Sequence, residues 1–167
     1  APIGKRAVRC AMVQIRKILY PTDFSELSEH ALRYALSFAE SHRAELHVLH
    51  VVDEAYQYWM AMGPGALPMG PPPDEMLEIA RKELAKFIES KVKAVGVSVI
   101  PAALVGRPFM EIVSYAREKQ IDLIVLGTHG RSGLRHAILG SVAERVVRKA
   151  PCPVLTIRHP GHDFVMP

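Results

Sequence analysis

Three glycines and a serine at fixed spacing are the residues of this sequence best suited to chemistry. Gly127 ends an apolar run, Gly130 follows after two residues, and Gly140 and Ser141 come after nine more, where an amphipathic segment begins. Glycine lets a ligand approach the backbone closely because it carries no Cβ. The start of a helix offers free N–H groups and a partial positive charge, and both favour phosphate. The pattern therefore predicts an anion-binding loop between a strand and a helix.

Other interpretations of this loop stay open. Ser141 and Glu144 have the spacing of a capping box, which alone would account for the serine. The loop is not a Walker loop, because no Gly-Lys-Ser/Thr follows its glycines. Gly127, Gly130 and Gly133 also lack the spacing of the dinucleotide fingerprint. We favour a phosphate site, which is compatible with a cap at the same helix start.

Asp23 is a second candidate for binding. It stands three residues before Glu26, so it fits a capping box for the helix that follows. A carboxylate repels phosphate, but it accepts hydrogen bonds from ribose hydroxyls or a base amine. We favour a ligand role for Asp23 outside the phosphate site, with the cap as the alternative.

Two histidines and the remaining polar residues give no metal or catalytic signature. His47 and His50 are three residues apart on an expected strand, so their side chains point to opposite faces. We interpret them as structural histidines, and no Cys/His zinc constellation is present. No Ser-His-Asp arrangement or paired carboxylates predict a catalytic residue.

The overall composition limits the classes of function. The chain has 167 residues, a formal charge of +4 and two cysteines. These values favour a single domain in a reducing compartment, without a disulfide framework. The mild charge argues against nucleic acid as the partner. No apolar stretch is long enough to span a membrane and no signal-peptide core is evident, so a cytoplasmic protein is expected.

Strands and helices are expected to alternate along the chain. Strands are predicted at 15–20, 45–52, 97–105, 123–126 and 153–157, and helices at 25–41, 74–93, from 108 onward and at 141–150. Alternation of this kind predicts an α/β fold with a parallel sheet covered on both faces. In such sheets ligands bind beyond the carboxyl ends of the strands, where the strand order reverses.

The domain organisation follows from the same pattern. Residues 1–14 are interpreted as an N-terminal extension, 15–158 as one domain and 159–167 as a tail. Residues 55–73 form a Pro/Gly/Met-rich insertion, which we interpret as a lid, a partner surface or disorder. Asp74 is the expected cap of the next helix.

Three segments together resemble the universal stress protein family. They are Ile-Leu-Tyr-Pro-Thr-Asp-Phe-Ser at 18–25, His-Val-Val-Asp at 50–53, and the glycine pattern of 127–141. The resemblance covers about residues 15–158. It implies a three-layer α/β sandwich of the adenine nucleotide alpha-hydrolase-like type, with a five-stranded parallel sheet in the order 3-2-1-4-5. Family members that carry this glycine pattern generally bind ATP.

The resemblance also implies roles for individual residues. The nucleotide-binding set would be Pro21, Thr22, Asp23, Val51, Leu126, Gly127, Gly130, Gly140, Ser141 and Val142. His129, Arg131 and Arg135 are interpreted either as groups that partly neutralise the phosphates or as a solvated loop face. Mg²⁺ or Mn²⁺ would sit on the phosphate oxygens and be completed mostly by water.

The function that these expectations favour is an ATP-binding stress-response switch with little or no turnover. ADP or AMP could replace ATP as the ligand. By resemblance, the protein would form a homodimer through its last strand, residues 153–157. The alternatives are a slow ATP hydrolase and a nucleotide-free interaction module.

Overall fold

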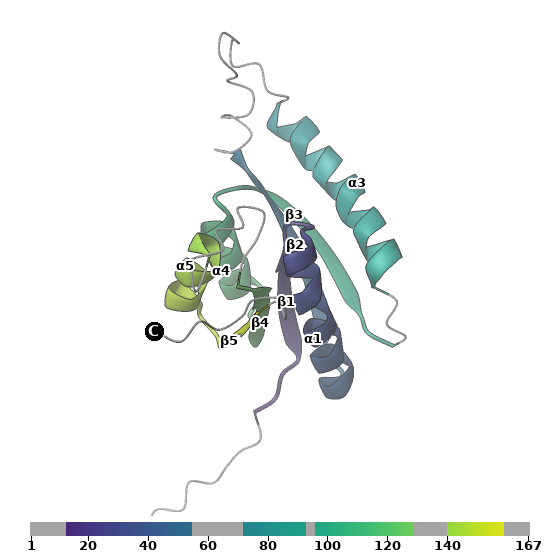
Figure 1. The fold of residues 1–167 in the computed structure, drawn as a ribbon, viewed down its shortest axis with the longest axis vertical. Coiled ribbons are helices and arrows are strands. Elements are labelled where there is room, and N and C mark those ends of the chain that lie inside the picture. Colours follow the sequence, from purple (N-terminus) through teal and green to yellow (C-terminus); the bar gives the residue numbers. More distant parts are fainter. Residues whose placement is uncertain (1–12, 55–71, 93–95, 129–139, 159–167) are drawn as a thin grey trace, which may run out of the picture.

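The described part of the chain is built on one five-stranded parallel sheet. The computed structural model describes residues 13–54, 72–92, 96–128 and 140–158. The strands are β1 (Lys17–Thr22), β2 (Glu45–Asp53), β3 (Val99–Gly106), β4 (Leu123–Gly127) and β5 (Val154–Ile157). Their order is β3-β2-β1-β4-β5, which confirms the α/β fold and the strand order implied by the resemblance (Figure 1).

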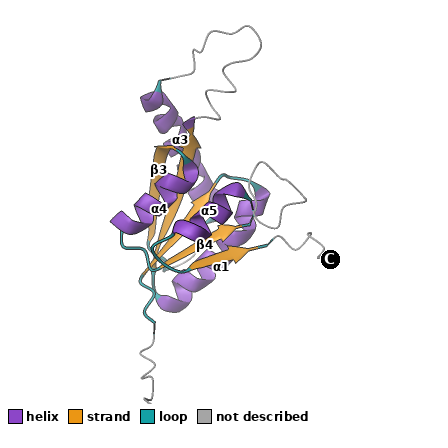
Figure 2. Cartoon of the chain, turned by 90° about the vertical axis from the view of Figure 1, so that its left-hand side faces the viewer, coloured by secondary structure: helices purple, strands orange, loops and turns teal. Residues whose placement is uncertain are grey.

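Helices cover both faces of this sheet (Figure 2). They are α1 (Glu26–His42), α3 (Pro73–Lys91), α4 (Pro108–Glu118) and α5 (Ser141–Lys149). Ala35 of α1 and Leu84 of α3 belong to the apolar cluster on one face, and Ile112 of α4 and Val146 of α5 to the cluster on the other. The result is the expected three-layer sandwich. Within the described residues, no helix has both the length and the apolar composition of a membrane span.

Most element boundaries differ from the sequence prediction by one or two residues, and two of these differences concern predicted turn and cap residues. β1 does not close before Pro21 but runs on to Thr22. α3 begins at Pro73 with Pro72 as its N-cap, so Asp74 is not the cap and lies in the first turn. Proline suits this position because the first helical N–H has no partner within the helix.

Candidate functional site

The sheet opens between β1 and β4 at its carboxyl edge. The described pairing of these strands joins Ile18 to Leu123 and Leu19 to Ile124, whereas β1 stays paired with β2 as far as Thr22. The carbonyl of Lys17 accepts from the N–H of Asp122, next to β4. Backbone groups alternate in direction along a strand, so those of every second residue from Lys17 on, including Pro21, face β4. Proline has no N–H, so Pro21 cannot donate a hydrogen bond toward β4. The strand order also reverses here, which is where ligands bind in such sheets.

Side-chain hydrogen bonds hold the turn between β1 and α1. Ser25 is the N-cap of α1, and its Oγ accepts from the N–H of Ser28 at 3.2 Å. Ser25 also donates its N–H, at 3.1 Å, and its hydroxyl, at 2.6 Å, to Oδ1 of Asp23. The hydroxyls of Thr22 and Ser28 lie 3.0 Å apart. The capping alternative for Asp23 is therefore wrong, because Ser25 caps the helix and orients the Asp23 carboxylate.

Phe24 and His50 join this turn to the end of β2. Phe24 has a φ of 63°, which is rare for a bulky residue. Its ring stacks on His50 with 4.2 Å between the ring centroids. Nδ1 of His50 lies 2.8 Å from the carbonyl oxygen of Thr22. A carbonyl oxygen can only accept, so Nδ1 carries the proton in this bond.

Tyr20 also stabilises this turn through a buried hydrogen bond. Its side chain is completely buried, and its hydroxyl donates to the carbonyl oxygen of Ser28 at 2.9 Å. Burial, partly offset by the hydrogen bonds, raises the pKa of Tyr20 to about 12. The neutral hydroxyl therefore remains a donor near neutral pH.

The start of α5 faces the opening from the other side. Gly140 is the N-cap and Ser141 the first helical residue, without a side-chain cap. Glu144 instead pairs with Arg148 at 3.0 Å, so the predicted Ser-x-x-Glu capping box is wrong. The N–H of Gly140 donates to the carbonyl oxygen of Thr128 at 2.7 Å, which fixes the helix start against the end of β4. The first turn of α5 retains N–H groups without partners inside the helix.

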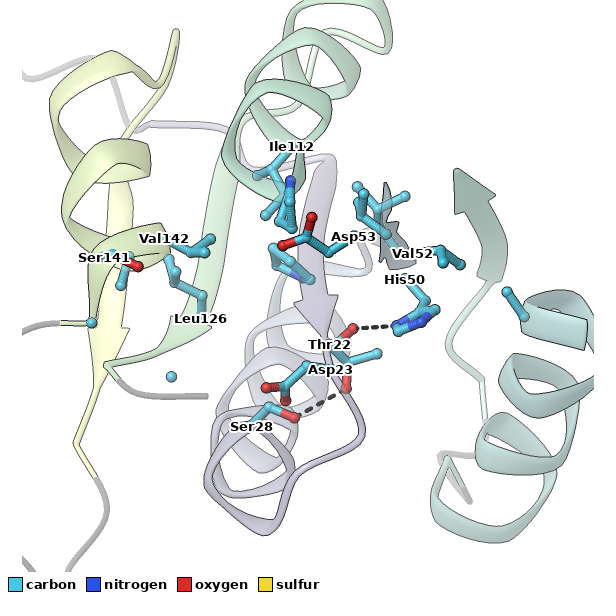
Figure 3. Close-up of a pocket in the computed structure, with 18 of the residues that line it drawn as sticks. Thr22, Asp23, Ser28, His50, Val52, Asp53, Ile112, Leu126, Ser141 and Val142 are labelled. Carbon is cyan, nitrogen blue, oxygen red and sulfur yellow. Dashed lines mark hydrogen bonds between the residues drawn. The ribbon is translucent and has the colours of Figure 1, made fainter. Parts of the chain in front are cut away.

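A cavity of about 480 Å³ occupies this opening. Its walls come from the β1–α1 turn, the ends of β2 and β4, and the helices α3, α4 and α5. Figure 3 shows Ser141 and Val142 on one side of it, and His50 and Val52 on the other. Asp23 and Asp53 lie between them, so groups from both sides of the opening face one shared space.

The carboxylates of the cavity come from one part of its wall. Asp23 lines it from the β1–α1 turn, Asp53 from β2 and Glu83 from α3. In the described residues, the walls from β4, α4 and α5 add no acidic side chain, and no lysine or arginine lines the cavity. The N-terminus of α5 supplies partial positive charge on the side where Ser141 lies (Figure 3). The cavity thus suits a ligand that is anionic at one end and rich in hydrogen-bond donors at the other.

The cavity brings together every predicted binding residue that the structure describes. They are Pro21, Thr22, Asp23, Val51, Leu126, Gly127, Gly140, Ser141 and Val142. Gly130, His129, Arg131 and Arg135 lie outside the described residues. The binding role of each residue stays a prediction.

Sequence reasoning missed several lining residues. They are Ser28, Leu49, His50, Val52, Asp53, Ile79, Ala80, Glu83, Pro108, Ile112, Thr128 and Ala143. Asp53 and Pro108 had a signal, since Asp53 follows a predicted strand and Pro108 starts a helix on the carboxyl side of another. The α3 residues had none, because the position of α3 over β2 depends on tertiary packing.

His47 lies on the opposite face of β2 from His50, as predicted. Its Nδ1 is 2.8 Å from the hydroxyl of Tyr115, and its Nε2 is 2.8 Å from Oε1 of Glu45. Burial lowers the pKa of His47, and the bond to Glu45 opposes this shift. These contacts explain His47 as a structural residue. The described part of the chain contains no group of three or more metal-ligating side chains.

Comparison of the whole chain with known proteins gives one consistent family. Residues 14–158 match the model of the universal stress protein family. Universal stress protein MJ0531 of Methanocaldococcus jannaschii is 37% identical over 149 residues, which cover 89% of this chain and 85% of that protein. Universal stress protein YxiE of Bacillus subtilis is 37% identical over 145 residues, covering 85% and 98%.

Solved structures agree with this comparison. Protein MJ0577 of Methanocaldococcus jannaschii has a TM-score of 0.74 at 32% identity, and the match covers 89% of this chain and 99% of that one. A universal stress protein from Archaeoglobus fulgidus, solved in complex with dAMP, has a TM-score of 0.59 at 26% identity and covers 87% and 98%.

Proposed function

The chain belongs to the universal stress protein family, and on that premise we propose that its cavity binds an adenine nucleotide and that the protein is a nucleotide-dependent switch. ATP is the proposed ligand, with ADP and AMP as alternatives. The observation that carries the proposal is the polarity of the cavity: the start of α5 lines one side, and the carboxylates come only from the β1–α1 turn, β2 and α3 in the described residues. The dAMP complex of the Archaeoglobus fulgidus relative supports the same class of ligand.

The order of the strands suggests how the nucleotide lies. Adjacent strands are about 4.8 Å apart, so β4 and β2 are separated by roughly 10 Å with β1 between them. Phosphates would lie against the first turn of α5 and the end of β4, at Gly127 and Ser141. The ribose would lie near Asp23, whose Oδ1 is already oriented by Ser25. The base would reach backbone groups around Val51.

The phosphate charge needs compensation beyond the start of α5. We assign this to His129, Arg131 and Arg135 of the glycine loop, with Mg²⁺ or Mn²⁺ on the phosphate oxygens. Gly130 would offer its backbone groups to the phosphates. The described part of the cavity contributes no carboxylate at its α5 end. Such a cation would therefore be held by phosphate and water, a mode that Mg²⁺ tolerates well.

Turnover is proposed to be slow or absent. The carboxylates that could act as a general base line the cavity from the β1–α1 turn, β2 and α3, and none of them belongs to α5. A base must be within hydrogen-bond reach of the water that it activates. Sustained release of ADP over many turnovers, lost in Gly127→Val, would favour the slow hydrolase instead.

A thermal shift experiment with paired variants tests nucleotide binding. At one hundred times its Kd, ATP should stabilise the protein by about 2.7 kcal/mol, which is several degrees for a chain of this size. Ser141→Ala and Asp23→Asn should reduce the shift. Ser114→Ala and Asp74→Asn make the same changes outside the cavity and should leave it unaltered. No shift at millimolar ATP, ADP or AMP would contradict the proposal.

The last strand is the proposed dimer interface. Pro153 and Ile157 direct their carbonyls to β4, so the alternate residue Thr156 turns its N–H to the outer edge of β5. An edge strand of this kind can pair with a second copy of the chain. Sedimentation should give a dimer for the wild type and for Thr156→Val, and a monomer for Thr156→Pro. A monomeric wild type would contradict this interface.

A further inference from the structure

Helix α3 closes the end of the cavity that is farthest from α5. Ile79, Ala80 and Glu83 line it, a spacing that places them on one face of the helix. Ala80 is buried and belongs to one apolar cluster with Val52 and Met76. This packing holds one turn of α3 over the carboxyl end of β2, next to the position proposed for the base.

Two side chains on this wall differ from ordinary surface residues. Ile79 lines the cavity and is 48% exposed, so it presents apolar surface without being covered by the protein. Two ion pairs of α3 involve other carboxylates than that of Glu83: Lys82 pairs with Glu78, and Lys91 pairs with Glu29. The carboxylate of Glu83 has no hydrogen bond or ion pair with any described residue. The wall therefore offers one apolar contact and one unused acceptor to a ligand.

We propose that Ile79 and Glu83 recognise the base of the nucleotide, with Ile79 packed on its face and the Glu83 carboxylate accepting from an exocyclic amine. This inference rests on the proposed nucleotide binding. An ionised carboxylate only accepts hydrogen bonds. It favours the 6-amino group of adenine and repels the 6-oxo group of hypoxanthine. Glu83 is thus a specificity-determining residue that selects 6-aminopurine nucleotides.

Isothermal titration of the full chain with ATP and with inosine triphosphate tests this role. We expect the wild type to bind ATP ~10-fold more tightly, the usual order for a hydrogen bond to a charged acceptor. Glu83→Gln should bring the ratio of the two dissociation constants toward one, because an amide can donate to the oxo group as well. Glu89→Gln removes the same charge from the same helix outside the cavity and should keep the wild-type ratio.

The proposed contact of Ile79 with the base is tested separately. Ile79→Ser should weaken both nucleotides by the same factor, because packing on the face of a purine does not depend on the 6-substituent. Unchanged affinity in this variant would overturn the role of Ile79. Both Ile79 and Glu83 are exposed, so the fold should survive either substitution, and thermal unfolding without ligand checks this.

The outcomes separate this inference from the proposed function. A wild type that binds the two triphosphates equally would overturn base recognition by Glu83 and leave nucleotide binding intact. Base recognition by Glu83 would also be overturned, and nucleotide binding left intact, if Glu83→Gln weakened the binding of both triphosphates by the same factor. A wild type that binds neither triphosphate, and no other adenine nucleotide, would overturn both.

Discussion

Nδ1 of His50 lies 2.8 Å from the carbonyl oxygen of Thr22, and this hydrogen bond ties the end of β2 to the end of β1. It forms where the described pairing between β1 and β4 has already ended. β2 is therefore the strand that supports β1 at the edge of the cavity. Asp23 follows Thr22 directly, so the position of its carboxylate depends on this bond.

Substitution of His50 should weaken both the fold and the site. His50→Leu removes the side-chain donor to the carbonyl of Thr22 and the ring that stacks on Phe24, which should lower the free energy of unfolding by ~1 kcal/mol. His50→Asn retains a donor near Nδ1 and should lose less. Urea unfolding measures this as a lower midpoint at an unchanged m-value. We also expect ATP to bind less tightly to His50→Leu, and equal affinity in all three proteins would show that β2 does not position Asp23.

Ser25 offers a test of how Asp23 is oriented. Ser25→Ala removes the N-cap of α1, which typically costs about 1 kcal/mol, and also the 2.6 Å hydrogen bond to Asp23. Both the unfolding midpoint and the affinity for ATP should fall. Ser25→Thr retains the hydroxyl and should stay close to the wild type in both measurements. A Ser25→Ala protein that loses stability and keeps full ATP affinity would show that Asp23 needs no such orientation.

The arrangement of the layers could be predicted from the sequence because strand and helix patterns alternate and one strand, β4, is continuously apolar. Leu123–Leu126 are all buried, as expected for a parallel strand covered on both faces. Alternation with helices then leaves few topologies, and the family resemblance selected the observed order. Asp23 and the glycine pattern also indicated two chain segments that line the cavity at the switch point, and their binding roles stay predictions.

The helix starts could not be resolved in the same way. Asp23 and Ser25 both suit an N-cap, and only the backbone path set by Phe24 at φ 63° decides between them. Gly140 and Ser141 present the same ambiguity, which the structure settles in favour of Gly140. Glu83 was missed because its position over the cavity depends on how α3 packs on β2 and β3. Tertiary packing of this kind leaves no local signal in the sequence.

Tyr20 should make the fold sensitive to alkaline pH. An unfolded tyrosine ionises near pH 10.0, whereas the folded pKa of Tyr20 is about 12, so the unfolded state loses its proton first. The free energy of unfolding should therefore fall between about pH 10 and 12, by up to about 3 kcal/mol. Tyr20→Phe lacks this contribution. It should be less stable than the wild type at pH 8, because the hydrogen bond from the Tyr20 hydroxyl to the Ser28 carbonyl is lost. The difference in the free energy of unfolding should narrow as pH rises.

His47 should act at acid pH with the opposite sign. Burial lowers its folded pKa below 6.5, so below that pH the unfolded state binds a proton that the folded state resists. The contribution of His47 to the free energy of unfolding should therefore rise with pH up to about 6.5 and stay constant above that pH. His47→Asn is neutral throughout and should show a shallower acid slope, although it is less stable at pH 8 because Tyr115 and Glu45 lose a shared partner. Identical acid slopes in the two proteins would show that the bond to Glu45 cancels the effect of burial.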